Sequence, residues 1–125
     1  MISAANSYAP RLLPLRLPRV CVAVTASDPA DLIDKAEALI RDNPFLEFRL
    51  DYISKPALAL PKIKQFLETH PGTMVIATCR RAASGGKFRG SIASQLDLLA
   101  KASGVGCQLV DVELQTALKI GRAHV

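Results

Sequence analysis

Cysteine, aromatic residues and long apolar runs are scarce in this sequence, and each shortage excludes a class of protein. The three cysteines are an odd number, are widely spaced and form no C-x-x-C pair, which argues against a disulfide framework and against a zinc site. We expect reduced, mostly buried thiols in a cytoplasmic protein. No apolar run could span a bilayer, because prolines and arginines interrupt the stretch 12–20. Neither a membrane protein nor a secreted protein with a signal peptide is therefore expected.

The shortage of aromatic residues also argues against a nucleic-acid partner for this positively charged chain. The chain of 125 residues carries a formal net charge of +5, but its basic residues are scattered and aromatic residues make up only 5%. A nucleic-acid surface normally gathers its basic residues on one face. We expect no nucleic-acid partner. Half of the residues are apolar, which is enough for the core of one ordinary domain.

What the sequence does contain is a regular alternation of strand-like and helix-like segments. The proline-containing start, 1–18, shows no steady period and is expected to be a loosely ordered leader. Strands are expected over four ranges: 20–25, 45–52, 73–79 and 107–114. Helices are expected between them, with these candidate first residues: Ser27 or Asp28 before Pro29, then Pro56 or Pro61, then Ser91.

Such alternation predicts an α/β protein with a parallel sheet covered by helices. Four strand and helix units do not decide between a doubly wound sheet and a barrel. A half barrel would leave two strand edges unpaired, so a closed barrel requires more sequence than the partial barrel expected over 19–118.

Charged residues lie inside the predicted strands, which is unusual for a parallel sheet buried on both faces. Glu47, Arg49 and Asp51 are spaced by two residues, so they share one face of the second strand. The same spacing recurs on the next two strands, at Thr78 and Arg80 and at Asp111 and Glu113. Because α/β enzymes bind ligands at the carboxyl ends of their strands, we expect one polar ligand-binding cluster there. The alternative is an edge strand whose charges face water.

The residue types in this cluster predict how it would bind. Buried arginine is stable only when paired, so Glu47 or Asp51 would hold Arg49 rigid, while Arg80 would be free to take a carboxylate or a hydroxyl. The loop 84–90 has glycines and two cations that could cradle an anion. Its residue order matches no known phosphate-binding motif, and a mobile loop at the mouth of the site is the preferred interpretation.

Histidines give no sign of a catalytic triad or of a metal centre. His70 precedes Pro71 at a predicted helix end, and His124 lies close to the last residue. Neither has a serine, cysteine or acidic partner at motif spacing. We therefore expect no metal.

Three of these patterns together resemble the type I 3-dehydroquinate dehydratases. Residues 47–51 spell E-F-R-L-D and resemble that family's E-x-R-x-D strand. Residues 78–80 followed by the glycines at 85–86 resemble its T-x-R strand with a double glycine, and 111–113 resemble its D-x-E strand. Order and intervals agree over roughly 19–117, and the combination is more specific than any single pattern.

The resemblance implies a fold and a reaction. The fold would be a TIM (β/α)8 barrel, of which this chain is the N-terminal half, with strands 1–4 and the intervening helices. The reaction would be the dehydration of 3-dehydroquinate to 3-dehydroshikimate in the shikimate pathway of aromatic amino acid biosynthesis. A lysine Schiff base would act as electron sink and a histidine would move protons, without metal or organic cofactor. Both residues would lie beyond the end of the chain, so the fragment would be inactive alone.

The resemblance also implies roles for residues of this chain. The residues expected to bind substrate are Glu47, Phe48 through its backbone, Arg49 and Arg80. For Arg80 the expected partner is a substrate hydroxyl or the surrounding carboxylate network. The carboxylates expected to support them are Asp51, Asp111 and Glu113. Two positions depart from the family pattern, because Ser84 stands where many relatives carry an acid and Ala23 where some carry a serine.

Several larger hypotheses accompany this assignment. The full-length protein is expected to be a homodimer, with or without a fused shikimate dehydrogenase domain. Two other hypotheses are a non-enzymatic half barrel that pairs with another chain, and another TIM-barrel enzyme for small anionic substrates. Residues 119–125 are also what a common sequencing-adapter sequence would encode, so we expect an artefactual tail there. The alternative is a natural helix end with Gly121 as the breaker.

Overall fold

The computed structural model describes residues 17–123. The predicted leader over 1–18 therefore lies almost wholly outside the described residues, as does His124. The strands are β1 (Val22–Val24), β2 (Phe45–Arg49), β3 (Met74–Thr78) and β4 (Leu109–Asp111). The helices are α2 (Pro29–Leu39), α3 (Leu60–Thr69), α4 (Ile92–Gly104) and α5 (Leu114–Ala123), with short 3-10 turns η1 (Leu50–Tyr52), η2 (Pro56–Ala59) and η3 (Ala82–Ser84).

The four strands form one parallel sheet in the order β1-β2-β3-β4. A doubly wound sheet reverses its strand order at a switch point, whereas a barrel adds each new strand on the same side of the last. The consecutive order therefore decides between the two predicted architectures. The chain has the open sheet of the N-terminal half of a TIM barrel, and the predicted fold class is confirmed.

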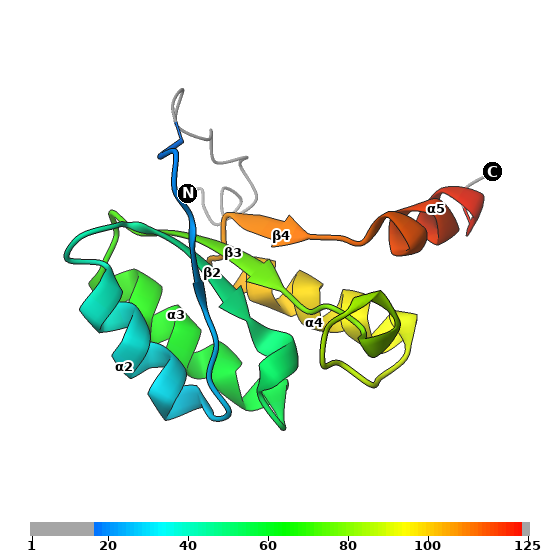
Figure 1. Ribbon diagram of the computed structural model, residues 1–125, viewed down its shortest axis with the longest axis horizontal. Coiled ribbons are helices and arrows are strands. Elements are labelled where there is room, and N and C mark those ends of the chain that lie inside the picture. Colours follow the sequence, from blue (N-terminus) through cyan, green and yellow to red (C-terminus); the bar gives the residue numbers. More distant parts are fainter. Residues whose placement is uncertain (1–16, 124–125) are drawn as a thin grey trace.

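Helices α2, α3 and α4 cover one face of this sheet, and the opposite face is open (Figure 1). Helix α5 continues from β4 and extends beyond the end of the sheet (Figure 1). Residues 119–123, part of the predicted tail, lie in α5. No helix in the described range 17–123 is long and apolar enough to cross a membrane.

Local sequence signals place the helix starts. The Asp28 carboxylate caps α2 by accepting from the amide of Asp31 at 2.9 Å, which satisfies one of the amides left over at a helix start. Ser91 caps α4 in the same way, at 3.1 Å from the amide of Ser94. Both prolines proposed as the start of the second helix are used, because Pro56 opens η2 and Pro61 lies in the first turn of α3.

Alternate residues of the central strands build the core against the helices. Leu46 and Phe48 on β2 are fully buried, as are Val75 and Ala77 on β3. The ring of Phe48 packs 5.8 Å from that of Phe66 on α3. Burying a side chain of this size contributes roughly 1.5–3 kcal/mol relative to leaving it exposed. This apolar layer fixes which strand residues are left to face the open side.

All four strands end earlier than the sequence pattern predicts, and β2 and β4 end three residues earlier. Strand β2 ends at Arg49 and β4 ends at Asp111, and both residues are paired in register with Thr78, the last residue of β3. A strand continues only while its neighbour pairs with it, so the end of β3 ends the strands on both sides of it. Asp51 therefore lies in a 3-10 turn, and Glu113 lies in the connection before α5.

The cysteines agree in part with the expectation of buried thiols. Cys79 and Cys107 are buried, whereas Cys21 is exposed, and all three are free. Burial raises the pKa of both buried thiols to about 12, so they stay protonated and unreactive at neutral pH. Among the described residues no three His, Cys, Asp or Glu side chains are placed to hold a metal ion.

Candidate functional site

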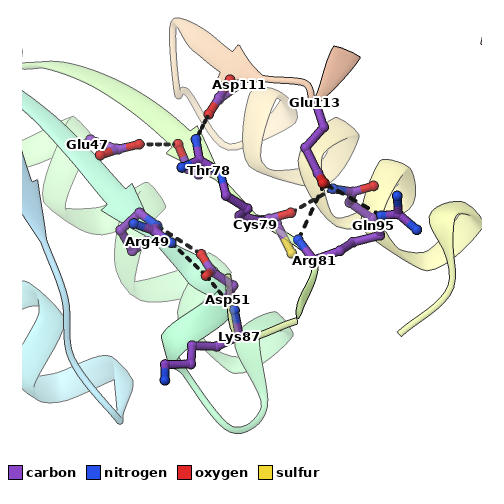
Figure 2. Close-up of polar contacts among 11 residues, drawn as sticks. Glu47, Arg49, Asp51, Thr78, Cys79, Arg81, Lys87, Gln95, Asp111 and Glu113 are labelled. Atoms are coloured by element: carbon purple, nitrogen blue, oxygen red, sulfur yellow. Dashed lines mark hydrogen bonds and ion pairs between the residues drawn. The ribbon is translucent and has the colours of Figure 1, made fainter. Parts of the chain in front are cut away.

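The candidate site lies on the open face of the sheet, at the carboxyl ends of the strands. Arg49, Thr78 and Asp111 are neighbours in register across β2, β3 and β4. Side chains alternate along a strand, so this row points away from the helices that cover Phe48. Figure 2 shows how the polar side chains at this end of the sheet lie.

Arg49 is held by Asp51 rather than by Glu47. Its Nε donates to Asp51 Oδ1 at 3.1 Å and its Nη2 donates to Asp51 Oδ2 at 2.9 Å, which makes a bidentate ion pair. The Asp51 side chain is completely buried and that of Arg49 is 14% exposed. The prediction that a carboxylate two residues away would hold Arg49 rigid is confirmed for Asp51, although Asp51 does not lie on the strand.

Asp51 has a further partner across the site. Its Oδ2 also accepts from the amide of Lys87, at 3.0 Å, in the loop between β3 and α4. Burial raises the pKa of the Asp51 carboxyl, but hydrogen bonds from Arg49 and from the Lys87 amide more than offset this and the net effect is a lowered pKa. The carboxylate is therefore charged at neutral pH and joins the end of β2 to this loop.

Glu47 is bound to the neighbouring strand. The hydroxyl of Thr78 donates to Glu47 Oε2 at 2.6 Å (Figure 2). Thr78 is 1% exposed, so its hydroxyl needs this partner. The contact leaves the other carboxylate oxygen, Oε1, available on the open face, where it could accept from a ligand hydroxyl.

Arg80 is not free, contrary to the sequence prediction. Its Nη2 donates to Asp111 Oδ2 at 2.8 Å, and both side chains are 37% exposed. The prediction failed because it did not place Asp111, which pairs in register with Thr78, next to the residues that follow β3. An ion pair this exposed contributes about 0–1 kcal/mol, so a ligand can displace it at little cost.

Glu113 points away from the open face, which corrects its placement beside Asp111. Its Oε2 accepts a short hydrogen bond from Gln95 Nε2 on α4 and lies 3.4 Å from the amide of Arg81 and 3.6 Å from its Nε (Figure 2). Burial raises the pKa of Glu113, but hydrogen bonds from Ser84, Gln95 and Arg81 outweigh it and lower the pKa overall. Strand β4 ends at Asp111, so the alternation of side chains along a strand does not extend to Glu113.

Gln95 is a buried residue that sequence reasoning missed. It is 1% exposed, its amide nitrogen also donates to the carbonyl of Cys79 at 2.8 Å, and its oxygen accepts from the hydroxyl of Thr116 at 3.2 Å. A signal was present, because Gln95 shares the three-to-four spacing of the buried residues Leu98 and Ala102 of α4. Together with Glu113 it braces the end of β3 against α4 and α5.

Five of the seven amides of the loop 84–90 donate to other groups of the protein, so they are not available to an anion. The amide of Gly86 donates to the Arg81 carbonyl and that of Phe88 to the Arg80 carbonyl, each at 3.0 Å. Gly85 has a φ of +89°, and a Cβ on Gly86 would lie 2.1 Å from the carbonyl oxygen of Arg80. The two glycines therefore serve this tight fold of the loop.

A hollow between two helices is not the candidate site. It measures about 340 Å³, lies between α2 and α3, and includes Glu37 and His70 in its lining. The His70 Nε2 is 3.4 Å from Glu37 Oε2. Both helices cover the face of the sheet opposite the polar cluster, so this hollow shares no residue with it.

Substitution of Asp51 tests whether the buried pair orders the site. We expect Asp51→Asn to lower the free energy of unfolding at neutral pH by about 3 kcal/mol, because it leaves Arg49 without its buried counter-charge. A carboxyl whose pKa is lowered by folding from its ordinary 3.8 stabilises the fold above that pH and ceases to do so as the pH falls through the folded-state value. The variant should therefore lose less stability on acidification, as measured by urea unfolding from about pH 6 to about pH 3.

Asp97→Asn is the matched control, because Asp97 forms an exposed pair with Lys101 on α4. That change should cost less than about 0.5 kcal/mol. Equal losses in the two variants, or an unchanged acid dependence in Asp51→Asn, would show that Asp51 does not order the site.

Comparison with known proteins identifies the family. Residues 20–124 match the sequence model of the family described as type I 3-dehydroquinase. A 3-dehydroquinate dehydratase of Coxiella burnetii is 30% identical over 106 residues, which cover 85% of this chain and 44% of that protein. Two 3-dehydroquinate dehydratases of Dehalococcoides mccartyi strains are 31% and 33% identical over 104 residues, or 82% of this chain and 41% of each. The chain thus spans less than half the length of these relatives, and it belongs to the type I 3-dehydroquinase family.

Proposed function

We propose that this chain supplies the substrate-orienting half of a 3-dehydroquinate dehydratase, a hydro-lyase that converts 3-dehydroquinate to 3-dehydroshikimate. The observation that carries the proposal is the set of polar side chains on the open face, with Glu47, Arg49 and Arg80 at the carboxyl ends of neighbouring strands. Enzymes built on this fold bind their substrates at that end of the barrel. The names of the similar proteins supply the reaction.

The geometry suits a small molecule that carries hydroxyls and a carboxylate. Asp51 occupies Nε and one Nη2 donor of Arg49, so the Nη1 donors remain for a substrate oxygen. Glu47 keeps one carboxylate oxygen that can accept from a substrate hydroxyl. Arg80 can exchange its exposed contact with Asp111 for a substrate oxygen. These three groups would fix the orientation of the ring rather than react with it.

The remaining predicted site residues take supporting roles in this proposal. The side chain of Phe48 is completely buried towards the helices, so only its backbone could contact a substrate. Asp51 holds Arg49, Asp111 neutralises Arg80, and Glu113 braces the end of β3 from the helix side. Rigid support of this kind keeps binding groups within the narrow range of positions that catalysis needs.

The covalent chemistry would come from outside this chain. We infer that a lysine Schiff base with the substrate ketone acts as the electron sink and that a histidine moves the protons, as the family resemblance implies. No organic cofactor or metal is part of this proposal. The proposed setting is the shikimate pathway in the cytoplasm, where the three free thiols would stay reduced. A homodimer of the complete protein is proposed on the resemblance alone.

Kinetics of the protein that contains this chain and the remaining strands test the function. We expect it to dehydrate 3-dehydroquinate. We expect Arg49→Lys to lower kcat/KM roughly tenfold or more, because lysine cannot keep both hydrogen bonds to Asp51 and still donate to the substrate. Arg41→Lys, at an exposed arginine after α2, is the control and should have no effect. An Arg49→Lys enzyme as active as the parent would remove Arg49 from the binding site.

The 125-residue chain by itself should carry no covalent chemistry. Incubated with 3-dehydroquinate and borohydride, it should show no dehydration, measured by absorbance, and no lysine adduct, measured by mass spectrometry, because this proposal assigns the electron sink to a lysine outside the chain. The complete protein is the positive control and should be inactivated with one adduct per chain. A reduced adduct on any lysine of the isolated chain would contradict this division of labour.

A further inference from the structure

Two glutamines bind the backbone at the two ends of β3. Gln108, just before β4, accepts from the amide of Val75 at 2.9 Å and donates to the carbonyl of Thr73 at 3.0 Å. Gln95, on α4, donates to the carbonyl of Cys79, the residue after β3, at 2.8 Å. The candidate site lies at the carboxyl end of the strand, so Gln95 stands beside the site and Gln108 does not.

Gln95 holds the residues on both sides of Arg80 in the chain. Its Nε2 donates to the carbonyl of Cys79, which precedes Arg80. The same Nε2 donates to Glu113 Oε2, which also accepts from the amide of Arg81 at 3.4 Å. Figure 2 shows Gln95 and Glu113 meeting beside Cys79 and Arg81. The backbone before and after Arg80 is therefore bound from the helix side of the sheet.

A third contact fixes which way the amide of Gln95 faces. Its Oε1 accepts from the hydroxyl of Thr116 on α5 at 3.2 Å. If the amide were turned over, Oε1 would face the Cys79 carbonyl and the Glu113 carboxylate, which are both acceptors. Gln95 is 1% exposed and Thr116 is fully buried, so water does not replace these partners. The side chain therefore has one favourable orientation.

Arg80 needs such support, because its own contact is weak. Its Nη2 binds Asp111 Oδ2 at 2.8 Å, but both side chains are 37% exposed and the pair is screened by water. Asp111 lies two residues before Glu113, so the hydrogen bond between Gln95 and Glu113 also holds the end of β4 against the end of β3. The direction of Arg80 is thus set mainly by the backbone behind it.

We propose that Gln95 is a positioning residue of the proposed dehydratase, which holds the backbone around Arg80 so that its guanidinium meets the substrate on the open face. Gln95 lies on the helix side and touches no substrate itself. A binding group displaced by about 1 Å can cost an enzyme about a hundredfold in rate. The inference rests on the proposed function, because that function gives Arg80 a substrate to bind.

The competing explanation is that Gln95 only satisfies buried polar groups and stabilises the fold. Both explanations predict a less stable protein when Gln95 is replaced. They differ in whether the kinetic effect depends on Arg80. A residue that acts through Arg80 has no effect on the reaction once the guanidinium is gone, whereas its contribution to stability remains.

A double-mutant cycle in the complete protein tests the proposal, with Gln95→Leu and Arg80→Gln made alone and together. We expect Gln95→Leu alone to lower kcat/KM for 3-dehydroquinate roughly tenfold. In the Arg80→Gln enzyme the same change should alter kcat/KM less than about twofold. The decrease in the urea midpoint of unfolding should be the same in both backgrounds.

Two further variants complete the set. Gln108→Leu removes hydrogen bonds of the same kind from the amino end of β3, so it should lower the urea midpoint and leave kcat/KM within about twofold of the parent. Thr116→Val removes the donor that orients the Gln95 amide and should lower kcat/KM roughly threefold, again only where Arg80 is present. This milder change carries the test if Gln95→Leu does not fold.

The outcomes separate this inference from the proposed function. An active protein in which Gln95→Leu lowers kcat/KM equally with and without Arg80 overturns the positioning role and leaves the function standing. Parental kinetics in Gln95→Leu, or an equal kinetic loss in Gln108→Leu, overturns it as well. A protein with no dehydratase activity overturns both the inference and the function.

Discussion

The buried carboxylate of Asp51 is the constraint on which the open face depends. A charge that is completely removed from water is tolerated only when its oxygens are bonded, and Asp51 meets this need with the guanidinium of Arg49 and the amide of Lys87. The turn η1 after β2 brings Asp51 back beneath the last residue of the strand. One side chain thereby sets the direction of Arg49 and the distance between two loops that sequence places far apart.

The other charged pairs repeat this arrangement at the next strand. Arg80 and Arg81 are consecutive, yet they pair on opposite sides of the sheet, with Asp111 on the open face and Glu113 towards the helices. The pair of Arg80 and Asp111 is exposed enough to exchange for a ligand, whereas the pair of Arg81 and Glu113 is half-buried beside Gln95. A rigid support therefore lies directly behind an exchangeable binding group, and the arrangement suits a site that must orient a polar ring.

Much of the fold could be predicted from the sequence because its signals are local. The alternation of strands and helices, the caps at Asp28 and Ser91 and the parallel sheet all follow from residues close together in the chain. The period of two also identified the open face correctly up to Arg49. It failed at Glu113, because the pairing of β4 with β3 ends at Asp111 and no local signal records where a neighbouring strand stops.

The partners of the polar side chains were harder to predict for the same reason. The pairing of Arg80 with Asp111 and of Glu47 with Thr78 joins residues 31 positions apart. The sequence shows which side chains share a face of the sheet, but it does not show which of them bind one another. Arg49 was simpler, because its partner lies two residues away. Lys87 was visible only as part of a glycine-rich loop, and no local signal indicated that its amide would bind Asp51, 36 positions away.

The most direct measurement is a crystal structure of the complete protein with quinate, an unreactive carboxylate that has a hydroxyl where 3-dehydroquinate has its ketone. The account predicts that quinate lies on the open face at the carboxyl ends of the strands, with oxygens within hydrogen-bonding distance of Glu47, Arg49 and Arg80. Quinate bound elsewhere, with none of its oxygens within hydrogen-bonding distance of Glu47, Arg49 or Arg80, would contradict it.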